Sequence, residues 1–403
     1  MATIDPFVFS LIAVAIIYSA IGAFLWKNKK NVKIEWMAFI PVILYRSKRT
    51  IEHVRKLGRT YEKFWQIYGT IAIPVAFIAM AFIVYFLIQQ VLATITKVLN
   101  GETLQSAVQF ILPGASASSS GIVQFVPIWY FLGSLAIILV VHELMHGVVA
   151  EAFKLKLKSV GFGLLAIIPL AFVEPDEKQF NKAPLRAREA ILASGAFTNF
   201  VVAIIVLGLT TFLVAPAIAG TFDFTGAKIV SITPGEPAEL AGLEAGDIIT
   251  AANGIELKST KHFVNILSAN KPGDSITLAT NNGDKTAIFG ENPKQEGLAY
   301  LGIQFQSESA VKPTIADRYG QLPWALQYMA QFFYWLFVLN IGIGLFNLLP
   351  IGPLDGGKMA NSLIDYVIKN KTNAQKVFML ISYLSLALLL FNLFGPAILG
   401  GFQ

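Results

Sequence analysis

The sequence contains no cysteine and only four histidines among its 403 residues. The absence of cysteine excludes disulfide bonds and thiolate metal ligands, so any metal ion must be bound by histidine or carboxylate side chains. Charged residues are also scarce, at 14% of the chain, whereas about 25% is usual in soluble domains. Hydrophobic residues reach 55% and the mean hydropathy is +0.61. This composition predicts an integral membrane protein.

Apolar runs long enough to cross a bilayer, which requires about 20 residues, occur six times. We therefore predict a polytopic α-helical membrane protein with about six transmembrane helices, near residues 7–26, 70–93, 128–152, 190–216, 324–349 and 375–396. The first run lacks the features of a cleaved signal peptide, and so we expect a retained anchor. The third and fifth runs contain polar residues, which makes them the most informative.

Lysine and arginine are distributed unevenly between these runs, which indicates the orientation in the cell membrane. Of the 31 basic residues, eleven lie in 27–64, seven in 153–188 and three in 350–373, but only one lies in 97–127. The positive-inside rule places the first three segments in the cytosol. Both termini and segment 220–323 are then extracytoplasmic. Because the basic residues follow topology, we expect no nucleic-acid partner.

Two segments interrupt the pattern of long apolar runs. In 220–323 the hydrophobic runs shorten to strand length, with turn signals such as Asn253-Gly254 between them, which predicts a soluble and mainly β insert. Residues 159–176 are apolar but contain Gly161, Gly163 and Pro169. Because irregular backbone is not tolerated against lipid, we expect a re-entrant, β-like segment covered by the spans. A similar run at 36–45 is expected to be interfacial.

The stretch "VVHELMHGVVA" places His142 and His146 one helical turn apart on the same face. Two imidazoles at this spacing bind one Zn²⁺, and Glu143 can then act as a general base on a zinc-activated water. The alternative is an interfacial helix end with coincidental histidines. A glutamate within a membrane span is costly and usually functional, which favours the metal site.

A catalytic zinc ion requires a third protein ligand and one open position. The remaining histidines, His53 and His262, lie in a basic cytosolic segment and in the outer insert. A carboxylate is therefore expected, and Asp355 in "NLLPIGPLDGGK" follows the fifth run at the cytosolic depth predicted for the two histidines of the third. The alternative is an ordinary aspartate of a Pro/Gly-rich turn.

The order of these motifs resembles the site-2 protease family of intramembrane zinc metalloproteases. H-E-x-x-H at 142–146 is followed by N-x-x-P at 347–350 and L-D-G at 354–356, with the insert between them. The resemblance covers about residues 125–365. It implies a Zn²⁺ cofactor, cleavage of transmembrane segments of membrane-anchored proteins, and a place as the second cut in regulated intramembrane proteolysis.

The resemblance also implies roles for individual residues. Zinc would be bound by His142, His146 and Asp355, with Glu143 as the base. Asn347 would contact substrate, although an interhelical hydrogen bond would explain it too. For Asn199, in "SGAFTNFVV", a substrate or active-site contact and a role in the helix bundle both stay open. The 159–176 segment would offer its edge to an extended substrate.

The insert resembles a PDZ domain of the bacterial-protease type over residues 226–257. The later "AYLGIQF" resembles the loop that binds a peptide C-terminal carboxylate through backbone N–H groups, which would involve Tyr300, Leu301, Gly302 and Ile303. Peptide binding is one possible role, and a bulky filter above the active site is the other.

The predicted domains are 1–96, a transmembrane pair with a basic cytosolic loop; 125–219, spans three and four with H-E-x-x-H; 220–312, the PDZ-like domain; and 320–403, spans five and six. Two other functions remain. A metal transporter would need ligands at several depths along its path. A catalytically inactive scaffold would be expected to have lost one of the four site groups.

Overall fold

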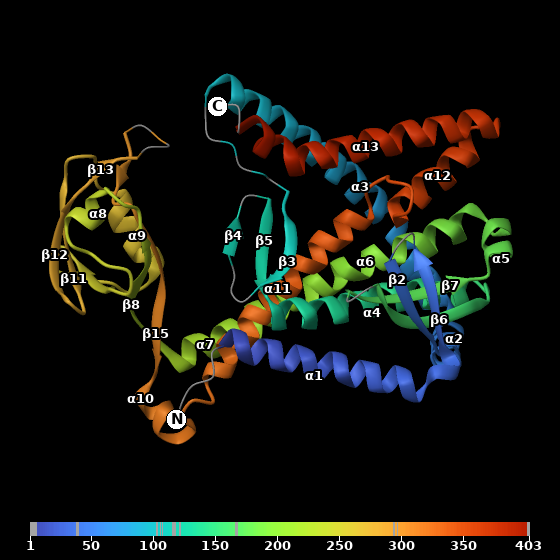
Figure 1. Cartoon of the computed structure of the whole chain (residues 1–403), viewed down its shortest axis with the longest axis horizontal. Coiled ribbons are helices and arrows are strands. Elements are labelled where there is room, and N and C mark those ends of the chain that lie inside the picture. Colours follow the sequence, from blue (N-terminus) through green and yellow to red (C-terminus); the bar gives the residue numbers. More distant parts are fainter. Residues whose placement is uncertain are drawn as a thin grey trace. The chain divides into compact units, whose positions relative to one another are not determined.

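The computed structural model describes residues 6–37, 40–101, 104, 106, 108–114, 118–120, 122–165, 168–292, 295 and 297–400. Its contacts divide the chain into two compact units (Figure 1). The membrane unit comprises Met1–Leu209 and Gln331–Gln403, and the β unit comprises Thr210–Ala330. The finer domain boundaries given above stay predictions.

Within the described residues, five helical stretches are long and apolar enough to cross a membrane. They are α3 (Glu62–Leu99), α4 (Ile128–Ala152), the stretch Leu185–Thr221, α11 (Trp324–Asn347) and α13 (Lys371–Gly400). The third stretch joins α6 (Leu185–Leu209), a π-helical turn (Thr210–Val214) and α7 (Ala215–Thr221). A further helix, α1 (Pro6–Lys27), covers the first predicted run. The prediction of a multi-pass α-helical membrane protein is confirmed.

The helix α2 (Lys48–Thr60) is held against the last turns of α4. The carboxylate of Glu151 on α4 is fully buried, and Arg59 donates to it from Nε at 2.9 Å, with Arg55 Nε at 3.6 Å. Gly58 permits the close approach, because a Cβ there would meet the carbonyl oxygen of Val148. A buried carboxylate that lost both arginines would be strongly destabilising, so this cluster anchors one end of α4.

A four-stranded antiparallel sheet lies beside these helices, in the order β1-β2-β6-β7 (Figure 1). Its strands are β1 (Val32–Met37), β2 (Ile40–Arg46), β6 (Leu157–Leu165) and β7 (Ile168–Pro175). The expected β-like segment is thus the β6–β7 hairpin, and the run expected to be interfacial supplies the end of β1 and most of β2.

Two sequence features of the 159–176 segment now have a structural reason. A Cβ at Gly161 or Gly163 would overlap the backbone of β2, so glycine is required where the two strands approach. Pro169 and Pro175 lie in β7, the outer strand of the sheet formed by the described residues, next to β6. Proline lacks an N–H and is tolerated on such an edge strand.

The part of the chain between α3 and α4 contains a small sheet that the sequence analysis did not predict. In it, β5 (Val123–Pro127) pairs in parallel with β3 (Phe110–Gly114) and antiparallel with β4 (Ser118–Ser120). The strands are short and rich in serine, glycine and proline, so they lack the alternation that marks a strand.

The β unit has a five-strand path in the order β12-β11-β9-β8-β15. Its elements are β8 (Phe222–Ile232), α8 (Pro237–Leu240), β9 (Ile248–Ala252), β10 (Ile255–Glu256), α9 (Thr260–Ser268), β11 (Ser275–Thr280), β12 (Gly283–Ile288), β13 (Gly290–Glu291), β14 (Ala299–Tyr300), β15 (Ile303–Val311) and α10 (Pro313–Tyr319). Phe263 of α9 is fully buried beneath the sheet, together with Ile229 and Ile249. The mainly β insert is confirmed.

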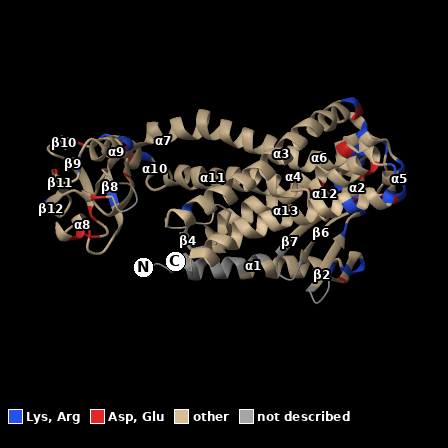
Figure 2. Ribbon diagram, turned by 90° about the horizontal axis from the view of Figure 1, so that it is seen from above, with Lys and Arg blue, Asp and Glu red and all other residues tan. Residues whose placement is uncertain are grey.

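The membrane unit is completed by three short helical elements: Lys29–Asn31, α5 (Glu177–Lys182) and α12 (Asp355–Val367). Within this unit, lysine and arginine gather at the end that contains α2 and α5 (Figure 2). The apolar lengths of the helices carry very few charges, as expected for segments surrounded by hydrocarbon.

Candidate metal centre

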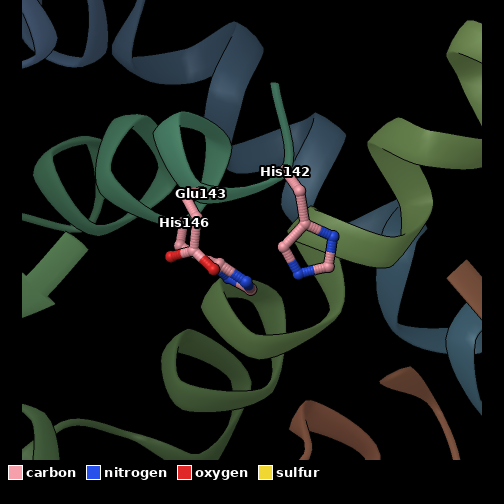
Figure 3. Close-up of side chains that lie close together, drawn as sticks. All are labelled: His142, Glu143 and His146. Atoms are coloured by element: carbon pink, nitrogen blue, oxygen red, sulfur yellow. The ribbon is translucent and has the colours of Figure 1, made fainter. Parts of the chain in front are cut away.

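One face of α4 presents a buried row at steps of four residues: Ser134, Ile138, His142 and His146. This spacing places the side chains above one another along the helix. The two imidazole rings have centroids 4.9 Å apart, and Glu143 lies beside them (Figure 3). Donor atoms of His142, Glu143 and His146 all lie within 4.8 Å of one another.

Asp355 approaches both rings from the first residue of α12. Its Oδ2 lies 3.1 Å from Nε2 of His142 and 3.1 Å from Nε2 of His146. A tetrahedral zinc ion with ligands at about 2.0–2.1 Å separates its ligand atoms by roughly 3.3–3.4 Å. Two imidazole nitrogens and one carboxylate oxygen at this spacing therefore fit a zinc ion.

The position of Asp355 depends on the two glycines that follow it. A Cβ at Gly356 would overlap the backbone of Leu348, and one at Gly357 would overlap the backbone of Ile351. The chain between α11 and α12 consequently folds directly onto the first turn of α12. This close turn brings the carboxylate back to α4.

The outer nitrogens of both histidines also have defined neighbours. His146 donates from Nδ1 to the carbonyl oxygen of Ile191 at 2.7 Å, which leaves Nε2 free to bind a metal. The amide Nδ2 of Asn199 lies 3.2 Å from Nδ1 of His142, and Oδ1 of the same amide is buried with no hydrogen-bond partner. A half-turn of the amide lets Oδ1 accept Nδ1–H of His142, which again leaves Nε2 free to bind a metal.

Gly195 is the point at which α6 passes beneath the two rings. A Cβ at this position would overlap Nε2 of both His142 and His146. Helix α6 can lie this close because it presents no side chain there.

We expect Gly195→Ala to displace one ring or the helix. Overpacking of this kind costs about 1–3 kcal/mol of folding stability, and here it would also separate the ligand atoms. The expected result is a lower midpoint of thermal unfolding together with a reduced zinc content per protein. Gly208→Ala on the same helix is the control, because a Cβ at Gly208 meets no atom within 4 Å. Normal zinc content in the Gly195 variant would contradict this role.

A pocket of about 210 Å³ opens at the cluster. Its walls include Glu143, His146, Asp355 and, from the edge strand β7, Val173 and Pro175. A second pocket of about 160 Å³ shares Glu143 and Val173 and extends along β2 and β6. Glu143 therefore lines both cavities, the one at His146 and Asp355 and the one bordered by the sheet.

Comparison with known proteins identifies the family. The sequence profile of Peptidase family M50 matches residues 130–392, which is more than half of the chain. The chain belongs to Peptidase family M50. Membership in this family confirms the predicted site-2 protease resemblance and the predicted metalloprotease. The cluster of His142, Glu143 and His146 is consistent with the predicted zinc cofactor.

Several curated proteins are similar to this M50 peptidase. An uncharacterized protein of Methanocaldococcus jannaschii is 29% identical over 329 residues, 81% of this chain and 79% of that protein. A putative zinc metalloprotease of Lactococcus lactis is 26% identical over 240 residues, 51% of this chain and 54% of its own. The regulator of sigma-W protease RasP of Bacillus subtilis is 24% identical over 264 residues, 54% and 60% of the two chains. The peptidase thus spans little more than half the length of the last two proteins.

Among solved structures, the PDZ domain of an SdrC-like protein from Listeria monocytogenes is 25% identical to part of the M50 peptidase. The match covers 20% of this chain and 88% of that domain, with a TM-score of 0.18. That score is low, so the fold of the β unit is defined by its own strand order and buried core.

The other predicted site residues lie as follows. Asn347 is half-buried at the last position of α11, directly before the turn to α12. Tyr300–Ile303 connects β14 to β15 in the β unit, where Leu301 is buried and Gly302 has φ +77°. The remaining histidines are engaged locally, since His53 contacts Arg49 and His262 accepts from the N–H of Lys258.

Proposed function

We propose that this M50 peptidase hydrolyses peptide bonds within transmembrane segments of membrane-anchored proteins. One observation carries the proposal: Oδ2 of an aspartate lies 3.1 Å from Nε2 of each of two histidines on an apolar helix more than 200 residues earlier in the chain. Because α4 is long and apolar enough to span a bilayer, this site lies at a depth where substrate helices are found.

In this mechanism His142, His146 and Asp355 would hold a zinc ion. When bound, such an ion would supply Lewis-acid chemistry, which lowers the pKa of a water to about 7 and polarises a carbonyl. Glu143 removes a proton from the attacking water at its carboxylate and transfers it to the leaving nitrogen. Ile191 and Asn199 hold the two rings so that their inner nitrogens face inward.

We propose that the substrate binds extended along the free edge of β7. A helix hides its own peptide groups, so a transmembrane substrate must unwind before cleavage. An edge strand can hydrogen-bond the unwound segment, and Val173 of β7 lines both pockets beside Glu143. Asn347, at the turn between α11 and the Asp355 helix, would contact the bound chain through its amide.

The distribution of charge supports an orientation for the protein. The end of the membrane unit rich in lysine and arginine would face the cytosol (Figure 2). The zinc site would then lie in the cytosolic half of the bilayer, with both termini and the β unit extracytoplasmic. This arrangement suits a β unit that excludes substrates whose outer domain is still attached. Tyr300–Ile303, which connects β14 to β15, would receive a peptide C-terminus in this arrangement.

The orientation can be tested directly because the chain has no cysteine. Single cysteines are introduced at two exposed lysines, Lys178 on α5 and Lys261 on α9. A membrane-impermeant maleimide is expected to label Lys261→Cys in intact cells and Lys178→Cys only after permeabilisation. The reverse labelling pattern would invert the topology.

The cleavage proposal is tested with purified protein in liposomes and a membrane-anchored model substrate. Mass spectrometry of the fragments is expected to place the cut inside the apolar segment, and zinc chelation should abolish it. Cuts confined to soluble regions would contradict intramembrane cleavage. Among the described residues, His142, Glu143 and His146 are the one cluster with metal-binding spacing. A transport path would require further ligands at other depths.

A further inference from the structure

The two oxygens of Asp355 have different neighbours. Oδ2 lies 3.1 Å from both imidazole Nε2 atoms, and Oδ1 lies 3.5 Å from Nζ of Lys358. The aspartate side chain is largely buried, whereas the lysine side chain is 54% exposed. The lysine therefore approaches from the open side of the site and holds the oxygen that does not face the histidines.

The presence of a lysine at this position is not explained by helix stability. Lys358 lies in the first turn of α12, where the helix dipole disfavours a positive charge. An ion pair half-exposed to water also stabilises folding only slightly. Because Gly356 and Gly357 have no side chains, Asp355 and Lys358 are the two side chains of this turn. Both line the pocket beside Glu143.

The pocket itself is rich in negative charge. Its described lining includes the carboxylates of Glu143, Glu177 and Asp355, and Lys358 is the one lysine or arginine among those lining residues. The other two proposed zinc ligands each have a partner behind the ring, the Ile191 carbonyl and the Asn199 amide. Such contacts orient metal ligands and strengthen metal binding.

We propose that Lys358 is a positioning residue that supplies this contact for the third ligand. By holding Oδ1, it keeps Asp355 turned so that Oδ2 alone faces the metal position. A catalytic zinc ion needs one position open for water and substrate. Without the ammonium group, the carboxylate of Asp355 can rotate. Oδ2 is then no longer held toward the metal position, and Oδ1 can occupy the position that water and substrate need. This inference rests on the proposed zinc site.

The test compares full-length wild-type protein with Lys358→Met, Lys358→Arg and the control Lys369→Met. Lys369 is exposed and lies just beyond the C-terminal end of α12. Its substitution by methionine removes the same charge at a position outside the pocket. Zinc affinity is measured by competition with a chelator. We expect Lys358→Met to bind zinc about 10- to 100-fold more weakly, with Lys358→Arg and Lys369→Met close to wild type. In cleavage assays at saturating zinc, kcat should fall in Lys358→Met with little change in KM.

A second measurement separates this role from a general loss of structure. The visible spectrum of Co²⁺-substituted protein reports the coordination number, and Lys358→Met should lose intensity as the carboxylate becomes bidentate. Wild-type zinc affinity and an unchanged cobalt spectrum in Lys358→Met would overturn the inference, even if activity fell. If the wild-type protein itself bound no zinc, the proposed function would fail as well. Equal zinc affinity and one common cobalt spectrum in all four proteins would remove the role of Lys358 and leave the proposed zinc site intact.

Discussion

Glu143→Gln is expected to retain zinc and to cleave a transmembrane substrate at least about 100-fold more slowly than the wild-type protein, since general acid–base catalysis contributes about 10²- to 10⁴-fold. The amide keeps the shape of the side chain but cannot accept the proton of the attacking water. Glu143 lies beside the histidines, within the 4.8 Å cluster, without being required to hold Asp355. Metal content and initial cleavage rate are measured on the same purified sample in liposomes.

The control for this variant is Glu52→Gln, an exposed glutamate on α2 outside both pockets. It should cleave at the wild-type rate. The Glu143 variant should also trap substrates, so that membrane proteins co-purify with it and can be identified. Cleavage by Glu143→Gln at the wild-type rate would show that another group accepts the proton, and the mechanism would be wrong.

Asp355→Asn is expected to lose most of its zinc and, with it, cleavage. The neutral amide cannot supply an anionic oxygen at the position 3.1 Å from both histidine Nε2 atoms. Two neutral imidazoles alone leave the metal with too few ligands, since catalytic zinc sites use three protein ligands. Metal analysis of the purified protein gives the bound zinc per chain, before and after dialysis against a chelator.

Asp365→Asn is the matched control, since Asp365 is an exposed aspartate on the same helix. It should keep both zinc and activity. Full zinc retention by Asp355→Asn would show that a different residue completes the site. In that case the short distances to the histidines would reflect packing alone.

The spacing of residues along the chain predicts part of the metal site. The i, i+4 relation of His142 and His146 is a property of the helix itself, so both rings had to lie on one face wherever α4 was placed. Asp355 could be inferred because few other ligands were available and because charge topology put it at the same depth. The residues that support the site were harder to predict from the sequence. Gly195 and Asn199 act through contacts between α6 and α4, which no local pattern reveals. Asn199 was named only through the family resemblance, and Lys358 gains its role because its neighbour Asp355 meets the histidines of α4.

The sheet makes the same point for the fold. The apolar run interrupted by Gly161 and Gly163 indicated a β-like segment, but its partner strand lies more than 100 residues earlier, at Ile40–Arg46. Strand pairing at that separation depends on how α2 and α4 bring the two hairpins together. The serine-rich sheet of β3–β5 went unpredicted for a related reason, since its strands have too little hydrophobic alternation to mark them.

The sequence alone determined that this protein spans a membrane, that it carries an inserted β unit, and which of its residues could bind zinc. These features follow from hydrophobicity, from the periodicity of residues along the chain, and from the small number of other residues that could bind a metal. Only the tertiary structure decided that α6 passes under the imidazoles at Gly195, that β7 is the outer strand of the described sheet beside Glu143, and that Asp355 meets both histidines of α4. Such contacts join segments distant in the chain, and they form only when packing brings those segments within a few ångströms.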